Sequence, residues 1–411
     1  MNITREVDHL YREYSGMLVS SLVAYFEINN LQVAEDIVQD TFISALKNWQ
    51  INGMPHSPKA WLFKVCKNKC INELRKKTVS LNITSDQTQE SPEIWLPNEL
   101  RDSQLRLLFA TCHPDFSTKA QIILTLKTVA SFKENEIAVG LGMTREAVKK
   151  ILTRTRAYIK NNNLLLKVPF RLQSKLRLTI VHQVLYLIFN EGYKASSGNN
   201  IIRKDLCLQA MRLVRLLLDS PQLNTADTHA LFSLMLFNVA RFNSRTSEEG
   251  EMIELKDQDR TLWDHQLIMT GVKHLNIANL AIQQVISRYH LEAGIASIHC
   301  LAKNFEQTNW NRILMLYRQL KKMYNSPFIQ LNYCIALHYH GDSEMALELL
   351  NKIDGLEYNL SYLCTKAMLY KHLNQHQRAI DYYLEALNAA QIPTEKHSIQ
   401  KKLDKLKTWN P

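Results

Sequence analysis

The stretch VAEDIVQDTFISALKNW, residues 33–49, decides the fold of the N-terminal part of the chain. Its apolar residues recur with the spacing of one helix face, at Val33/Ala34, Ile37/Val38, Thr41/Phe42, Ala45/Leu46 and Trp49. Its opposite face carries Glu35, Asp36, Gln39, Asp40 and Lys47. The pattern predicts an amphipathic helix that buries its apolar side and exposes a mostly acidic one.

Composition extends the helical prediction to the whole chain. Its 411 residues exceed what one hydrophobic core usually holds, so we expect about two to four domains. Apolar residues make up 46%, which excludes global disorder, and 11 glycines and 10 prolines are too few for a turn-rich β-protein. We therefore expect an all-α protein in which two small helical domains, the second a helix-turn-helix, are joined by a linker and followed by a large helical array.

The compartment is predicted from features that the sequence lacks. Residues 1–8 contain no apolar core like that of a signal peptide, and no apolar run approaches the ~18 residues that mark a membrane span. The 7 cysteines show no paired spacing, which is typical of a reducing compartment. We expect a soluble, cytoplasmic protein.

Changes in composition divide the chain into four parts. Residues 1–80 form a helical unit, interrupted by glycine and prolines at 52–58. Residues 81–102 carry five acidic side chains against one basic side chain and are predicted as an acidic linker. A second helical unit fills 103–165, and residues 166–411 are expected to form an α-helical extension.

A strongly basic helix is predicted from Lys59 to Lys77. Residues 59–80 hold seven basic residues and one acidic residue. The predicted buried stripe is Leu62, Val65, Cys66, Cys70 and Leu74, and the opposite face carries Lys64, Lys67, Asn68 and Arg75. Cations bordered by an aromatic residue suit a phosphate backbone with unstacked bases, although a solvated lysine face is the alternative. Trp61, at the border, either stacks on a base or anchors the core.

Residues 133–148 have the pattern of a helix-turn-helix. Ala138 packs where the two helices cross, Gly142 permits the turn, and Thr144 is a natural N-cap for the second helix. That helix is predicted to bury Ala147, Val148, Ile151, Leu152, Tyr158 and Ile159. A recognition helix enters the major groove by its N-terminal end, so the expected base contacts are Arg145, Glu146, Lys149 and Lys150. The expected phosphate contacts are Arg154, Arg156 and Lys160.

The extension carries two further patterns. Tyr362–Leu387 has the small and aromatic positions of a tetratricopeptide repeat, and a looser copy lies upstream. Polar residues gather in two short stretches: Asn190, Glu191, Tyr193, Ser196 and Ser197, then Asp257, Asp259, Arg260 and Asp264. They form either a ligand or partner pocket or a set of helix caps that satisfy one another, and the second interpretation is favoured. We expect no catalytic centre, no metal and no cofactor.

The motifs AEDIVQDTF (34–42), PKAWL (58–62) and NELR (72–75) closely resemble the second conserved region of bacterial RNA polymerase sigma factors of the extracytoplasmic-function (ECF) group. Residues 103–160 resemble the fourth region of these factors. The motifs LIFNEGY (187–193) and DQDRTLWD (257–264) resemble the subgroup with a long tetratricopeptide-like C-terminal extension. The resemblance covers nearly the whole chain.

The resemblance implies a sigma factor that binds core RNA polymerase and directs promoter recognition, promoter melting and transcription initiation. It assigns polymerase binding to Glu35, Asp36, Gln39, Asp40 and Phe42. It assigns the −10 promoter element to the first unit, with DNA contacts at Lys59, Trp61, Lys64, Lys67, Asn68 and Arg75. The helix-turn-helix would read the −35 element. The extension is expected to regulate activity through a regulatory protein or an intramolecular contact.

Two alternatives stay open. A stand-alone helix-turn-helix regulator with a protein-binding helical repeat would share residues 133–160 and the extension but would have no use for the 34–42 motif. An enzyme housed in residues 171–411 rests only on the polar residues of the extension and predicts a deep pocket with perturbed titratable groups.

Overall fold

The computed structural model describes residues 3–26, 31–79, 97–141, 143–162, 174–193, 203–247, 252–280, 286–390 and 393–407. Within these ranges the regular structure is helical, apart from one isolated antiparallel bridge between Thr246 and Met252. The all-α prediction is therefore confirmed. The chain divides into two compact units, Met1–Ile188 and Phe189–Pro411.

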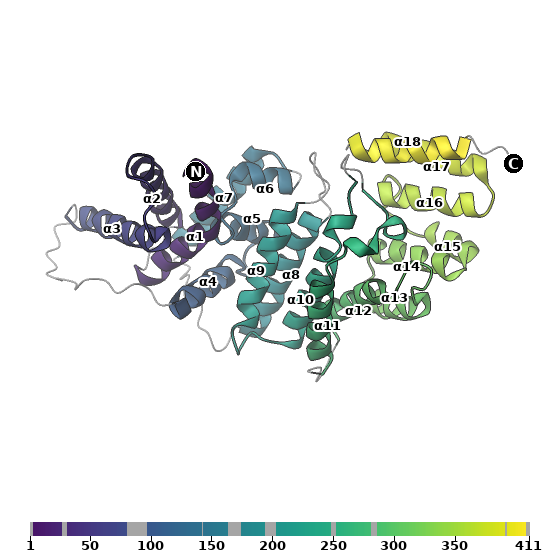
Figure 1. The fold of residues 1–411 in the computed structure, drawn as a ribbon, viewed down its shortest axis with the longest axis horizontal. Coiled ribbons are helices and arrows are strands. Elements are labelled where there is room, and N and C mark those ends of the chain that lie inside the picture. Colours follow the sequence, from purple (N-terminus) through teal and green to yellow (C-terminus); the bar gives the residue numbers. More distant parts are fainter. Residues whose placement is uncertain are drawn as a thin grey trace. The chain divides into compact units, whose positions relative to one another are not determined.

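The first compact unit covers the residues of both predicted helical domains (Figure 1). Its helices are α1 (Ile3–Tyr25), α2 (Leu31–Asn52), α3 (Pro58–Val79), α4 (Pro97–Thr111), α5 (Thr118–Thr128), α6 (Glu134–Gly140), α7 (Arg145–Asn161) and most of α8 (Ser174–Tyr193). Helix α1 packs against α2, α3 and α4.

The core of the first helical domain follows the spacing predicted for residues 33–49. Ala34, Val38 and Trp49 are almost completely buried, while Asp36 and Asp40 on the opposite face are exposed. Gly53 ends this helix with φ of 75°, in the left-handed region that glycine adopts without strain. The predicted break between the two helices therefore lies where the sequence places it.

Helix α4 begins earlier than predicted. It starts at Pro97, inside the stretch expected to be linker, because proline is well suited to the first turn of a helix and Leu105 and Leu108 further along are buried. The rest of the predicted linker, 81–96, lies outside the described residues, as does the expected boundary at 165. The two compact units divide after Ile188, since most of α8 groups with the first unit.

The second compact unit is a succession of helices. They are α9 (Lys204–Leu218), α10 (Ala226–Val239), α11 (His265–Leu280), α12 (Arg288–Leu301), α13 (Trp310–Met323), α14 (Pro327–His340), α15 (Ser343–Leu350), α16 (Leu360–His372), α17 (His376–Ala389) and α18 (Pro393–Lys407). Short 3-10 helices lie between α10 and α11: η1 (Phe242–Ser244), η2 (Leu255–Asp257) and η3 (Arg260–Leu262).

The repeat-like positions lie in two helical hairpins, α14–α15 and α16–α17. In α16–α17 the small residues Ala367, Ala379 and Ala386 are completely buried, so the two backbones approach closely, and Tyr370 and Tyr383 fill the remaining space. In Figure 1, α16 and α17 run alongside one another. Consecutive hairpins of this kind bury a face that one hairpin alone would leave exposed.

All seven cysteines are free thiols. Burial raises the pKa of Cys66 and Cys112 to about 12, so both remain protonated at neutral pH. None of the described helices is long and apolar enough to cross a lipid bilayer.

Candidate nucleic-acid and protein interfaces

The acidic face of α2 contains four of the predicted polymerase-binding residues. Asp36, Gln39 and Asp40 are exposed, and Asp36 accepts a hydrogen bond of 2.8 Å from the Gln32 side chain one turn earlier. Glu35 differs, because its side chain is only 13% exposed. Three of the four therefore remain available to a partner protein.

Phe42 does not belong to this face. Its ring is buried and meets the Tyr11 ring edge-on, with 4.9 Å between ring centroids. Position 42 follows the same stripe as Val38 and Ala45, so the helix turns it toward α1. The prediction of a direct partner contact at Phe42 is corrected to a core position that holds α2 in place.

The basic face of α3 is present as predicted. Lys59, Lys64, Asn68 and Arg75 are exposed, and Lys67 is half-buried. The Lys59 ammonium lies 5.7 Å from the centroid of the Tyr14 ring. Leu74, predicted as buried, is exposed at 36%, whereas Phe63 is buried instead. The apolar stripe of α3 is thus buried at Leu62, Phe63, Cys66 and Cys70 and becomes exposed at Leu74.

Trp61 packs on the core of the first domain. Its ring meets the buried Trp49 edge-on, with centroids 5.3 Å apart, and the side chain stays half-buried. An edge-to-face pair of this kind stabilises the domain beyond the apolar area that it buries. Of the two roles open to Trp61, this contact supports the core anchor.

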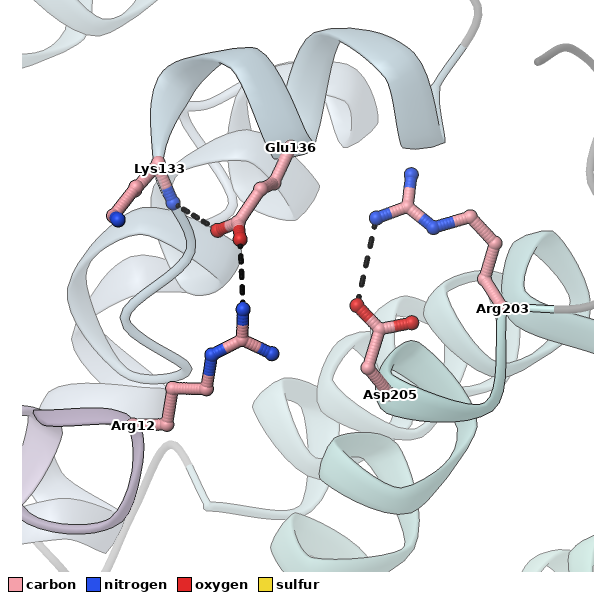
Figure 2. Close-up of polar contacts among 5 residues, drawn as sticks. All are labelled: Arg12, Lys133, Glu136, Arg203 and Asp205. Carbon is pink, nitrogen blue, oxygen red and sulfur yellow. Dashed lines mark hydrogen bonds and ion pairs between the residues drawn. The ribbon is translucent and has the colours of Figure 1, made fainter. Parts of the chain in front are cut away.

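Helices α6 and α7 have the arrangement expected of a helix-turn-helix. Thr144 caps α7, because its hydroxyl accepts a hydrogen bond of 3.2 Å from the backbone N–H of Ala147. Ala138 and Val148 are buried where the helices meet, and Gly142 lies outside the described residues. The start of α6 is also capped, since Glu136 accepts a 2.7 Å hydrogen bond from the backbone N–H of Lys133 (Figure 2).

The N-terminal half of α7 presents the predicted DNA-reading residues to solvent. Its exposed side chains are Arg145, Glu146, Lys149, Lys150 and Arg154. Arg145 and Lys149 also approach the Glu134 carboxylate of α6, at 3.4 and 3.9 Å, and these contacts orient both side chains. The surface has the length and charge to lie in a major groove.

Two residues toward the end of α7 depart from the predicted faces. Tyr158 is 42% exposed rather than buried, and its hydroxyl donates a 3.2 Å hydrogen bond to Asp115. Arg156, predicted to grip a phosphate, turns inward with a side chain only 17% exposed. It forms an ion pair with Glu35 and donates a hydrogen bond to Gln32, both on α2.

A junction therefore joins the two helical domains of the first compact unit. Besides the Glu35–Arg156 pair, the Thr128 hydroxyl donates a 3.1 Å hydrogen bond to Glu35. Arg12 on α1 contacts Glu136 on α6 at 3.2 Å (Figure 2). A cavity of about 140 Å³ at this place is lined by residues that include Asp36 and Gln39. Sequence patterns missed the junction because each helix reads, by itself, as having a solvated charged face.

Four of the polar residues predicted in the extension separate into two pairs. Asp259 and Asp264 are exposed and accept hydrogen bonds from nearby backbone N–H groups, at Thr261 and Leu267, as helix caps do. Tyr193 and Arg260 instead take part in a network of arginines and aromatic rings. Ser196 and Ser197 lie outside the described residues. The described part of the chain contains no group of three side chains suited to hold a metal ion.

Two known families match different stretches of the chain. Residues 10–79 match the sigma-70 region 2 family, and residues 177–279 match a family of unknown function, DUF6596. The first match covers α2, α3 and most of α1. No solved structure matches the chain.

Individual relatives extend the comparison. A probable RNA polymerase sigma factor of Haemophilus influenzae is 27% identical over 157 residues, which cover 34% of this chain and 80% of that protein. The ECF RNA polymerase sigma factor SigL of Mycobacterium tuberculosis is 29% identical over 120 residues, or 29% of this chain and 68% of that protein. An uncharacterized protein of Rhizobium meliloti is 30% identical over 399 residues, which cover 94% of this chain and 93% of the rhizobial protein. The chain therefore belongs to the family of this rhizobial protein and carries a sigma-70 region 2 domain in its N-terminal part.

Proposed function

We propose that this protein is an RNA polymerase sigma factor of the ECF group that binds core polymerase and directs promoter recognition, promoter melting and initiation. The observation that carries the proposal is the sigma-70 region 2 match at residues 10–79, on a domain whose α2 exposes Asp36, Gln39 and Asp40. The relatives named as sigma factors support the same role. A stand-alone DNA-binding regulator would have no use for that acidic face.

Two basic surfaces supply the DNA contacts in this proposal. The outer face of α3 binds the melted strand around the −10 element. The N-terminal half of α7 makes sequence-specific contacts with duplex DNA at the −35 element. Exposed lysines and arginines on both helices favour phosphate contact, because neutralising phosphates releases bound counterions. Arg145 and Lys149 are already oriented by Glu134, which reduces the entropy lost on binding.

The helical extension acts, in this proposal, as a regulatory module. A succession of helical hairpins offers an extended surface for a protein partner. The extension matches a family of unknown function over residues 177–279. This match ends before the two hairpins formed by α14–α17. We place the regulatory contact in the extension because α1–α7 already supply the polymerase-binding and DNA-binding surfaces.

Binding to core polymerase tests the proposal. Asp40→Ala removes an exposed carboxylate of α2 without touching the core, so we expect its affinity for core polymerase to fall about tenfold or more. Lys47→Ala, on the same helix and equally exposed, is the matched control and should bind like the unaltered protein. If the full chain does not bind core polymerase in a pull-down or a titration, the sigma-factor proposal is overturned.

A further inference from the structure

Three arginines of the second compact unit, Arg241, Arg245 and Arg260, lie in one cluster around aromatic rings. The guanidinium groups of Arg241 and Arg260 lie 5.9 and 4.5 Å from the centroid of the buried Trp263 ring. The Arg245 guanidinium lies 3.6 Å from the centroid of the Tyr193 ring. The cluster thus concentrates three permanent positive charges.

No carboxylate balances these charges in the described residues. None of the described Asp and Glu side chains forms an ion pair or hydrogen bond with Arg241, Arg245 or Arg260. The exposed Glu306 acts on Arg260 only from beyond ion-pair distance. Arg245 is buried, and a buried charge is costly without a partner, so an anion that reached the cluster would be stabilised by these charges.

The arginines are nevertheless held firmly in place. Arg260 donates through Nη1 to the carbonyl oxygens of His299 and Ala302, at 2.7 and 2.8 Å, where α12 ends. Arg245 donates to the carbonyl oxygen of Tyr193 at 2.8 Å, where α8 ends. Arg241 donates to the Tyr193 hydroxyl at 2.6 Å. Helix C-termini carry only a partial negative charge, so these contacts orient the arginines without neutralising them.

Several donors in the cluster lack an acceptor. Nε of Arg241 and Nη2 of Arg260 are buried and have no hydrogen-bond partner among the described residues, and the same holds for Nδ1 of His299. Burial, followed by the charges of Arg241 and Arg260, lowers the pKa of His299 to about 3. These effects show that the three groups share one neighbourhood, where an anion would find unused donors.

We propose that this cluster binds an oxyanion, the phosphate or carboxylate group of a small ligand, in the second compact unit. Guanidinium groups present planar, paired donors that match both oxyanions. Lys204, exposed and 5.7 Å from the centroid of the neighbouring Phe242 ring, adds a fourth positive charge at the rim. The site lies outside α1–α7 and is independent of the sigma-factor proposal.

Thermal unfolding and calorimetric titration of the full chain test the site. Inorganic phosphate, glycerol phosphate and acetate are compared at constant ionic strength, with chloride as the reference. At least one of them should raise the Tm saturably by about 2–5 °C and bind at one additional site. A response to acetate alone identifies a carboxylate ligand, and a response to the phosphates identifies a phosphate.

Substitutions in the chain then show whether the anion that raises the Tm binds at the arginine cluster. Arg260→Met should abolish the added site, and Arg241→Lys, which keeps the charge but removes Nε, should weaken it about tenfold. Arg378→Met on α17 makes the same chemical change outside the cluster and should keep the full response. The proposal is overturned if no oxyanion raises the Tm of the unaltered protein. It is equally overturned if Arg260→Met and Arg241→Lys respond as the unaltered protein does, because the anion then binds elsewhere, such as on α3 or α7.

Discussion

Glu35 and Arg156 form an ion pair with each other, although each was expected to contact a different partner molecule. The resemblance assigns Glu35 to polymerase and Arg156 to DNA, yet the two side chains form an ion pair that is largely withdrawn from water. An ion pair that is shielded from water is screened less by salt than one on the surface. Removing one partner leaves the other charge without its counterion. The pair therefore stabilises the junction between α2 and α7.

Glu35→Ala tests this contribution. The substitution removes the carboxylate partner of Arg156 at the junction and the acceptor of the Thr128 hydroxyl, so we expect the free energy of unfolding to fall by about 1–3 kcal/mol. Asp40→Ala, on the same helix but exposed, serves as the control and should change it by less than about 0.5 kcal/mol. Equal stability of the two variants in denaturant titrations would show that the junction contributes nothing.

The His229–His274 pair makes the stability of the second unit sensitive to acid. The two Nδ1 atoms are 2.7 Å apart, and Nε2 of His229 lies 2.6 Å from the side-chain oxygen of Asn224. His229 must donate to that oxygen, so it accepts at Nδ1 and His274 donates there. Burial, followed by the neighbouring His229, lowers the pKa of His274 to about 4.

The expected pH dependence follows from that lowered pKa. Unfolded histidine titrates near 6.5, so the unfolded chain binds more protons than the folded chain between about pH 6.5 and pH 4. Stability from this group is therefore complete above pH 6.5 and is lost as the pH falls toward 4. His274→Asn should flatten the decline in the denaturant midpoint over this range. A variant whose midpoint falls as steeply as that of the unaltered protein would contradict the assignment.

At the scale of elements, α7 carries both solvent-exposed basic side chains and a basic side chain that is ion-paired with α2. Arg154 is exposed, whereas Arg156, half a turn later, is held by Glu35. Arg154→Ala should reduce the slope of log K against log salt by about 1 on duplex DNA, because one phosphate contact is lost. Arg156→Ala should change that slope by much less. A filter or fluorescence titration over a series of salt concentrations measures both, and a larger slope change for Arg156→Ala would contradict the inward placement.

Elements were predictable where one helix carries its own pattern. The apolar spacing of α2, the Thr144 cap and the small residues of α16–α17 follow from local geometry, and the structure contains all three. Errors arose where a neighbouring element decides the environment. Leu74 is exposed although the helical spacing places it on the buried stripe, and Tyr158 meets Asp115 of a preceding loop. A helical wheel contains no information about such neighbours.

The candidate surfaces were likewise predictable where they depend on one helix, and not where they depend on contacts between helices. Charge and order along the chain identified the outer faces of α2, α3 and α7, since exposed charges need no partner to be recognised. The Glu35–Arg156 pair joins residues 121 positions apart, and nothing in either local pattern indicates it. The arginine cluster gathers residues from α8 to α12 in the same way, so only Tyr193 and Arg260 of the cluster were singled out from sequence.

At the scale of the whole molecule, the division at Ile188 shows where to separate the extension. Leu178, Val181 and Val184 of α8 are buried, so a cut near Asn161 would remove apolar residues that group with the first unit. A chain ending after Tyr193, at the end of α8, should keep a folded first unit that still binds core polymerase. Its transcription should differ from that of the full chain, and equal transcription with and without the extension would contradict a regulatory role.

The most direct test of the central claim is transcription in vitro. Purified core polymerase is supplied with the full chain and with the DNA that lies upstream of its own gene, and transcripts are counted and their start sites mapped. A sigma factor gives specific transcripts from a defined start, and Asp40→Ala or Lys149→Ala reduces them several-fold. If the full chain binds this DNA but yields no specific transcript with core polymerase on any promoter-containing template, the protein is a DNA-binding regulator and not a sigma factor.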